Sequence, residues 1–259
     1  MKVNIKALTA AAAAMVCAIS AQAQGFSGEA SVKYATPLHF DVSAAVDYRT
    51  TDNFKDTDQW GLEAGIAAKP LKWLKVGVGY NFIQEHFPSA VSNNQKYDVN
   101  AYWTTKHRVY AGLTGSLKIW KFTLSLRERY QFTHRPGFEV PRFSVDDGTP
   151  AGNKSVDRKD KHVLRSRLEL SFKPYKKCRF EPYVSYEIYS QLYSVKDDNK
   201  NGTITEGGRI SEKQKLTAGC SYKINKHNSV ELFYRYVNAS DPDDRDASHL
   251  IGAGYSLKF

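Results

Sequence analysis

Two pairs of arginines with the same spacing are the side chains of this sequence best suited to binding chemistry. Arg127 and Arg129 are separated by one residue, and so are Arg165 and Arg167. Residues two apart lie on the same face of a β-strand, so each pair would present two guanidinium groups side by side. The planar donor fork of arginine suits carboxylate and phosphate groups. These residues therefore indicate either an anion-binding site or ion pairs with acids of the same chain.

Further charged residues share a face with these arginines when the flanking segments are interpreted as strands. We expect a lumen charge network of Arg108, Arg127, Arg129, Arg165, Arg167, Glu169, Glu181, Glu187, Glu231 and Arg235. An isolated buried ion is costly, so these groups should pair and leave the interior mostly closed. The alternative is a narrow anion-attracting pore or a small-ligand site. Glu128 falls on the opposite face, which indicates a bulge or a register shift nearby.

One loop has the ligand spacing of the first part of a calcium-binding loop. Asp197, Asn199, Asn201 and Thr203 stand at positions 1, 3, 5 and 7 of such a loop. Position 12, where a bidentate Glu is expected, is Gly208, and the flanking segments are strands. We expect a flexible turn, with weak calcium binding as the alternative, and no other cofactor.

Strands must position all of these residues, because apolar and polar residues alternate along most of the chain. From Phe40 to Tyr48, for example, every second residue is apolar or aromatic. A period of two over eight to twelve residues is the signal of a half-buried strand. The strands are expected at about 38–50, 59–69, 72–83, 105–118, 121–134, 161–173, 178–193, 211–224, 228–238 and 248–259.

The connections between these segments alternate between short turns and long polar loops. Short turns on one side and long loops on the other are typical of outer-membrane barrels. The fold class is therefore expected to be all-β: a transmembrane, up-and-down antiparallel β-barrel over residues 38–259, with about ten strands and twelve as the alternative. This order places both chain ends on the short-turn side. Residues 24–37 are expected as a lead-in segment, with a plug or an extra strand as alternatives.

Composition supports a barrel and excludes a helical membrane protein. Mean hydropathy is −0.52, and no stretch after the N-terminus approaches the ~20 apolar residues of a spanning helix. The chain has 16 Tyr, 13 Phe and 4 Trp, and many of them lie near the ends of the expected strands as two girdles around an aliphatic band, for example Tyr80 at the long-loop ends and Phe122 at the short-turn ends. The net charge of +10 comes without a nucleic-acid-binding motif, so no nucleic acid partner is expected.

The N-terminal segment has the three parts of a secretory signal peptide. Lys2 and Lys6 precede an apolar run at 7–19, and Ala21-Gln22-Ala23 forms a small-residue cleavage site. Residues 1–23 are therefore expected to be removed. Cys178 and Cys220 remain, and we expect two free thiols, with a bridge between neighbouring strands as the alternative.

The last strand resembles the C-terminal assembly signal of bacterial outer-membrane barrels. Phe259 ends the chain, and Leu257 and Tyr255 precede it at every second position. More of the chain, from Lys106-His107-Arg108-Val109-Tyr110 to Pro182-Tyr183-Val184-Ser185-Tyr186-Glu187, resembles the domain-of-unknown-function 2490 family of Bacteroidetes outer-membrane barrels. The resemblance implies a barrel and brings no established activity.

We expect an outer-membrane protein that is not an enzyme, because catalytic constellations are incomplete. His227 and Ser229 have the spacing found in outer-membrane phospholipases but sit in a short turn, and Asp243, Asp244 and His249 lie near a loop end. The expected role is a structural or surface-interaction barrel, with the pore or ligand barrel and then an enzyme as alternatives. Outer-membrane lipid, lipopolysaccharide and the barrel-assembly machinery are the expected partners, and a protein partner stays unknown.

Overall fold

The computed structural model describes residues 23–36, 40–92, 95–175, 177–198, 202–240 and 247–259. Regular structure in these ranges is entirely β-strand. No helix long and apolar enough to cross a membrane occurs among these residues. The expected signal peptide, apart from Ala23, lies outside the described ranges.

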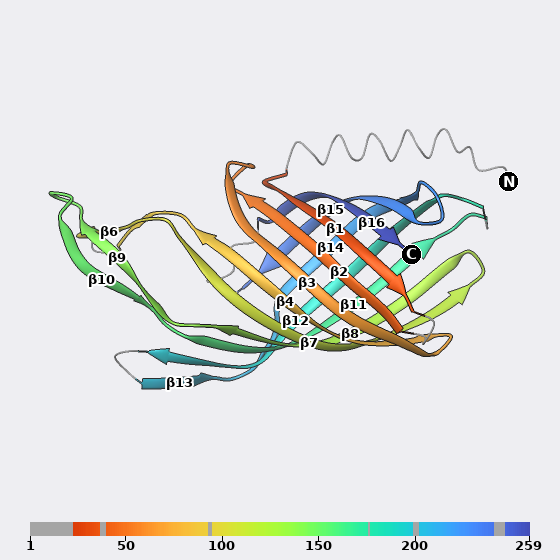
Figure 1. The fold of residues 1–259 in the computed structure, drawn as a ribbon, viewed down its shortest axis with the longest axis horizontal. Helices are drawn as coiled ribbons and strands as arrows, with labels where there is room; N and C mark the ends of the chain where they lie inside the picture. Colours follow the sequence, from red (N-terminus) through yellow and green to blue (C-terminus); the bar gives the residue numbers. More distant parts are fainter. Residues whose placement is uncertain (1–22, 37–39, 93–94, 176, 199–201, 241–246) are drawn as a thin grey trace.

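Eleven strands form a closed barrel with tilted strands (Figure 1). The order around it is β11–β8–β7–β4–β3–β2–β1–β16–β15–β14–β12, and pairing of β12 with β11 closes the ring. The strands are β1 (Gly25–Ala35), β2 (Phe40–Thr51), β3 (Asp56–Leu71), β4 (Leu74–Phe87), β7 (Tyr102–Ile119), β8 (Phe122–Arg135), β11 (Lys159–Phe172), β12 (Phe180–Asp198), β14 (Arg209–Lys223), β15 (Asn228–Ala239) and β16 (His249–Lys258). A further strand, β13 (Gly202–Glu206), pairs with the end of β12 as a hairpin.

The all-β barrel prediction is confirmed, and the ten expected strands are all present in it. The wall has eleven strands where about ten were expected, because residues 25–35 form the extra strand that was the alternative to a lead-in segment. In β1, Phe26, Val32 and Tyr34 alternate with polar residues such as Glu29 and Lys33, so this segment can fill a place in the wall.

The first strand also changes the topology, because it pairs in parallel with the last. Gly25 lies opposite Leu250 and Lys33 opposite Lys258, whereas β1 and β2 are antiparallel. The expectation that both chain ends lie on the short-turn side was therefore wrong. β1 begins at the end of the barrel that carries the long connections, the long-loop end, and β16 finishes at the opposite, short-turn end (Figure 1).

Alternation along the strands separates the two faces of the wall. On β8, Leu124 and Leu126 are outward and exposed, whereas Ser125 and Arg127 between them are inward and half-buried. Inward aromatic rings lie over glycines of neighbouring strands. A Cβ added to Gly252 would come within 2.1 Å of the ring of Phe233. Such covering by a ring compensates for the missing side chain of a strand glycine.

A second sheet extends beyond the barrel at the long-loop end. Its strands are β5 (Ala90–Val91), β6 (Tyr97–Val99), β9 (Phe138–Ser144) and β10 (Pro150–Val156), in the order β10–β9–β6–β5. Val99, Val140 and Val156 form a buried cluster of its own, and Tyr102 and Phe138 pack against it. Figure 1 shows β6, β9 and β10 extending away from the barrel, and the β12–β13 hairpin lies separate from them.

Candidate functional site

The inward face of β8, β11 and β12 holds a buried carboxylate that binds two arginines. Glu187 on β12 is 6% exposed. Arg165 on the adjacent β11 donates from Nε to Oε1 at 2.5 Å and from Nη2 to Oε2 at 2.9 Å. Arg127 on β8 donates from Nη2 to Oε1 at 2.9 Å, and the Tyr189 hydroxyl donates to Oε2 at 3.2 Å. One carboxylate therefore links three successive strands through charge-assisted hydrogen bonds.

Two more acids of the expected network have cationic partners nearby. Arg167 contacts Glu169, two residues along the same strand. Glu181 lies 3.5 Å from Nζ of Lys223 and accepts a 3.5 Å hydrogen bond from Ser171. Both acids have side chains that are about a third exposed to solvent, 32% for Glu169 and 29% for Glu181. These contacts are therefore weaker anchors than the buried Glu187.

The rest of the expected network contacts hydroxyl groups and aromatic rings. Arg108 donates to Thr133 Oγ1 at 3.0 Å, Arg129 lies 3.9 Å over the ring of Tyr110, and Arg235 donates to Thr217 Oγ1 at 3.2 Å. Glu231 accepts a hydrogen bond from Tyr183. The contacts of the ten residues thus form separate local groups along the wall, and a single connected network among them stays a prediction.

Inward tyrosines are the site residues that the sequence did not single out. Tyr110 reaches from β7 across β4 and donates to Oε1 of Glu63 on β3 at 2.6 Å. Its ring fits because the residue beneath it is Gly79, where a Cβ would lie 2.3 Å from the tyrosine hydroxyl. Asn81 donates to the other oxygen of Glu63 at 3.0 Å. An inward glycine beside an inward tyrosine on the next strand is the signal that could have found these contacts.

Ion pairs also surround the lumen at the long-loop end. They join Arg49 to Asp58 at 2.6 Å, Lys161 to Glu212 at 2.7 Å, and Lys106 to Glu85. Asp160 accepts hydrogen bonds from His134 at 2.5 Å and from Arg158 at 2.6 Å. Burial raises the pKa of Asp160, but these two hydrogen bonds outweigh it and hold the pKa below its ordinary value.

The outward face carries a row of tyrosines that bond to neighbouring strands. Each of the five strands that run toward the long-loop end has one tyrosine bonded to the following barrel strand: Tyr48 to Thr57 (2.8 Å), Tyr80 to His107 (2.6 Å), Tyr130 to His162 (2.6 Å), Tyr186 to Gln214 (2.9 Å) and Tyr234 to His249 (2.5 Å). Glu128 is also outward and accepts a 2.5 Å hydrogen bond from Ser166. The pairing of β8 with both neighbours continues without a shift, so the bulge or register shift expected there was wrong.

The calcium-like loop is part of a hairpin. Asp197 lies opposite Thr203 in the β12–β13 pairing, accepts its hydroxyl at 3.0 Å and lies 3.6 Å from Arg158. Asn199 and Asn201 lie outside the described residues, as do Asp243 and Asp244. The described residues hold no group of three or more His, Cys, Asp or Glu suited to a metal ion. Cys178 and Cys220 are free thiols.

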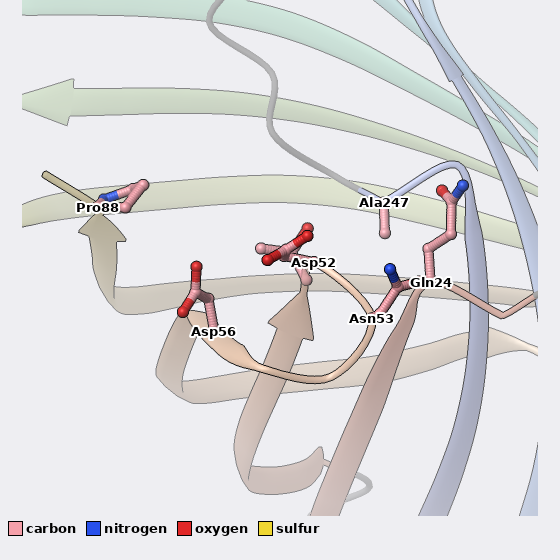
Figure 2. A pocket seen from close by; sticks show the side chains of 7 residues that line it. Gln24, Asp52, Asn53, Asp56, Pro88 and Ala247 are labelled. Atoms are coloured by element: carbon pink, nitrogen blue, oxygen red, sulfur yellow. The ribbon is translucent and has the colours of Figure 1, made fainter. Parts of the chain in front are cut away.

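A cavity of about 600 Å³ lies where the chain enters the barrel at the long-loop end. Its lining residues are Gln24, Thr51, Asp52, Asn53, Asp56, Pro88 and Ala247. Figure 2 shows Asp52 on the β2–β3 connection and Asp56 at the start of β3, with Gln24 just before β1 and Ala247 just before β16. Asp52 and Asn53 have φ angles of 47° and 54°, the left-handed turn that Asp and Asn tolerate.

Comparison with known proteins identifies the family without an activity. No curated protein matches the chain. The family model described as "Protein of unknown function (DUF2490)" matches residues 26–248, which include ten of the eleven wall strands, all but β16, and the second sheet. This match covers most of the chain, and the protein therefore belongs to the DUF2490 family.

Proposed function

We propose that this protein is an outer-membrane barrel that meets an external partner through the second sheet at its long-loop end. The observation that carries the proposal is this sheet itself. Val99, Val140 and Val156 give it a hydrophobic cluster separate from the barrel, and Val91 and Val145 on its surface are 54% and 45% exposed. Loops that merely connect strands have no need of such a core, whereas binding residues often lie on loops held by a rigid scaffold.

The outward face of the barrel supports the membrane location. Large apolar side chains such as Leu62, Val78 and Leu126 are 48–56% exposed on several successive strands. A monomeric soluble protein rarely exposes so continuous an apolar surface. The tyrosine row lies at one end of this surface, and Phe122 and Phe172 are paired at 4.9 Å at the other. Aromatic girdles on both sides of an apolar band suit a bilayer.

The lumen charges fit a braced interior better than a wide channel. Glu187 is covered by Arg127 and Arg165, and Tyr110 and Tyr183 lie across the wall over glycines. A barrel of this strand number has an interior that such side chains can largely fill. The structural role of the barrel is then to hold the second sheet outside the cell.

The location is tested by fractionation and by gel mobility. The mature chain should be found with the outer membrane and should migrate differently before and after heating. Deleting Phe259, whose strand we propose the barrel-assembly machinery recognises by edge pairing, should slow insertion. A mature chain in the soluble periplasm without heat-modifiable migration would contradict the proposed location.

The surface role is tested with a photo-crosslinking residue placed at Val145 or Val91 in intact cells. Leu117, which is outward and 59% exposed near the short-turn end, is the matched control. Adducts of defined mass should form from the two sheet positions and differ from those of the control, which faces lipid. Absence of such adducts, together with single-channel steps in planar bilayers that shift when Arg127 or Arg165 is neutralised, would replace the proposal with an anion pore.

A further inference from the structure

The arginines of β8 and β11 lie opposite one another on two adjacent strands. Arg129 is directly opposite Arg165 in the register, and Arg127 is directly opposite Arg167. Opposite residues of neighbouring strands have Cβ atoms ~4.5–5.5 Å apart, and like charges in such pairs destabilise a sheet. Four guanidinium groups on two adjacent strands therefore need negative charge beside them, and the carboxylates that contact them are Glu187 and Glu169.

The carboxylate side chain of this cluster is more deeply buried than the arginine side chains that bind it. The side chain of Glu187 is only 7% exposed, whereas those of Arg127 and Arg165 are 24% and 20% exposed. The acid is thus covered by the arginines that bind it. The more exposed part of this cluster therefore consists of positively charged N–H donors.

The donors of this surface are only partly used by the protein. Arg165 uses Nε and Nη2 on Glu187, and Arg127 uses Nη2. Each guanidinium has five N–H donors, so several remain for a ligand. The Cζ atom of Arg129 lies 3.9 Å from the centre of the Tyr110 ring, a cation–π contact that helps to position this guanidinium.

Further cations come from the other side of the cluster. The ring of Tyr189 on β12 has Arg165 5.0 Å from its centre, Lys215 at 5.5 Å and Lys213 at 5.8 Å. One tyrosine ring therefore gathers positive groups from β11 and β14. Together with Arg127 and Arg129, these cations form a surface on three strands, β8, β11 and β14. We call it the arginine cluster: Arg127, Arg129, Arg165, Lys213 and Lys215.

We infer that the arginine cluster is a binding site for a small oxyanion, of the carboxylate or phosphate class, inside the barrel. A planar guanidinium offers two parallel donors to one carboxylate or phosphate group, and neighbouring rungs of β8 and β11 place a second guanidinium within reach of the same ligand. The site requires neither conduction through the barrel nor a partner at the second sheet. If the oxyanion site is absent, the proposed surface role is unaffected. If the surface role is wrong, the oxyanion site is likewise unaffected.

The experiment is a titration of the purified full-length mature barrel in detergent, followed by calorimetry and thermal unfolding. Inorganic phosphate and succinate are the two probes, and chloride at equal ionic strength is the reference. Either oxyanion should bind with measurable heat and raise the unfolding temperature beyond the chloride effect. Phosphate alone, succinate alone or both would support the site and identify its ligand class. Oxyanion effects equal to those of chloride would overturn it.

Substitutions locate the site on the arginine cluster. Arg129→Gln should weaken oxyanion binding about tenfold, because a hydrogen bond to a charged group is worth at least that factor. Arg129→Lys keeps the charge but loses the fork, so it should bind less tightly than the wild type and more tightly than Arg129→Gln. Arg179→Gln is the matched control, since this exposed arginine precedes β12 at the short-turn end. Equal losses in Arg129→Gln and Arg179→Gln would show that only net charge matters and would overturn the inference.

Discussion

Replacing Glu187 with glutamine should destabilise the barrel more than replacing any other lumen acid that we have described. The substitution keeps the size of the side chain and removes the charge that Arg127 and Arg165 share through three hydrogen bonds. Breaking a buried ion pair on one side costs about 3–5 kcal/mol, because the partner charge stays buried. The side chains of the two arginines are 24% and 20% exposed, so hydration by water offsets part of this loss. We therefore expect about 3 kcal/mol, the low end of that range.

Glu181→Gln is the matched control for this prediction. Glu181 is also a lumen carboxylate on β12, but its side chain is 29% exposed and its cationic partner Lys223 is 49% exposed and 3.5 Å away. Exposed pairs contribute about 0–1 kcal/mol. For a chain of this size, 1 kcal/mol shifts the unfolding temperature by roughly 2–4 °C. We expect a shift of about 6–12 °C for Glu187→Gln and less than about 4 °C for Glu181→Gln.

The assay is thermal unfolding in detergent, followed by circular dichroism and by loss of heat-modifiable gel mobility. A double-mutant cycle with Arg165→Gln separates the pair from the rest of the fold. The double variant should lose less than the sum of the two single losses, because the second substitution removes a charge that is already unpaired. Equal, small shifts for Glu187→Gln and Glu181→Gln would refute the reasoning and would mean that lumen water solvates both acids.

Three further predictions test the wall, the topology and the mouth of the barrel. Gly252→Ala should lower stability by about 1–3 kcal/mol in thermal unfolding, because its Cβ would clash with the ring on the neighbouring strand, whereas Gly115→Ala, which has open space at its Cβ, should change it little. An epitope tag placed before Gln24 should be reached by antibody on intact cells while a tag after Phe259 should not; the reverse pattern would refute the parallel closure. Asp160 has a lowered pKa, so its stabilisation should be present above pH ~3.9 and be lost as the pH falls below that, measured as a shrinking difference in unfolding temperature between the wild type and Asp160→Asn.

The barrel strands could be predicted from sequence because each carries its own period of two. Leu74 to Phe82, for instance, alternates between outward apolar residues and inward Lys75, glycines and Asn81, and it forms β4. The place of β1 could not be predicted in the same way. Its alternation is present, but parallel pairing with β16 joins the two ends of the chain and leaves no local trace in the sequence.

The second sheet was missed for a different reason. β5 has two residues and β6 has three, and β10 reads Pro-Ala-Gly-Asn-Lys-Ser-Val, a polar segment with residues that disfavour strands. Pairing among four loop segments makes these residues strands, and Val99, Val140 and Val156 meet only once the segments are paired. Burial shared among distant segments is a property of the fold and cannot be read from any one of them.

The charged lumen shows where sequence reasoning about a site stops. Alternation placed Arg127, Arg165 and Glu187 on the inward face, but the choice of partner depends on register, and a slip of one residue would turn each side chain outward. The observed contacts also skip strands: Arg127 on β8 reaches Glu187 past β11, and Tyr110 on β7 reaches Glu63 past β4. Long side chains can span two strands only where the strand between them leaves room, as Gly79 does under Tyr110. An inward glycine therefore makes room for the Tyr110 contact, whereas Arg127 reaches Glu187 past Arg167, which lies between them in the register. The lumen of such a barrel is better predicted from its glycines and tyrosines together with its charges than from charge alone.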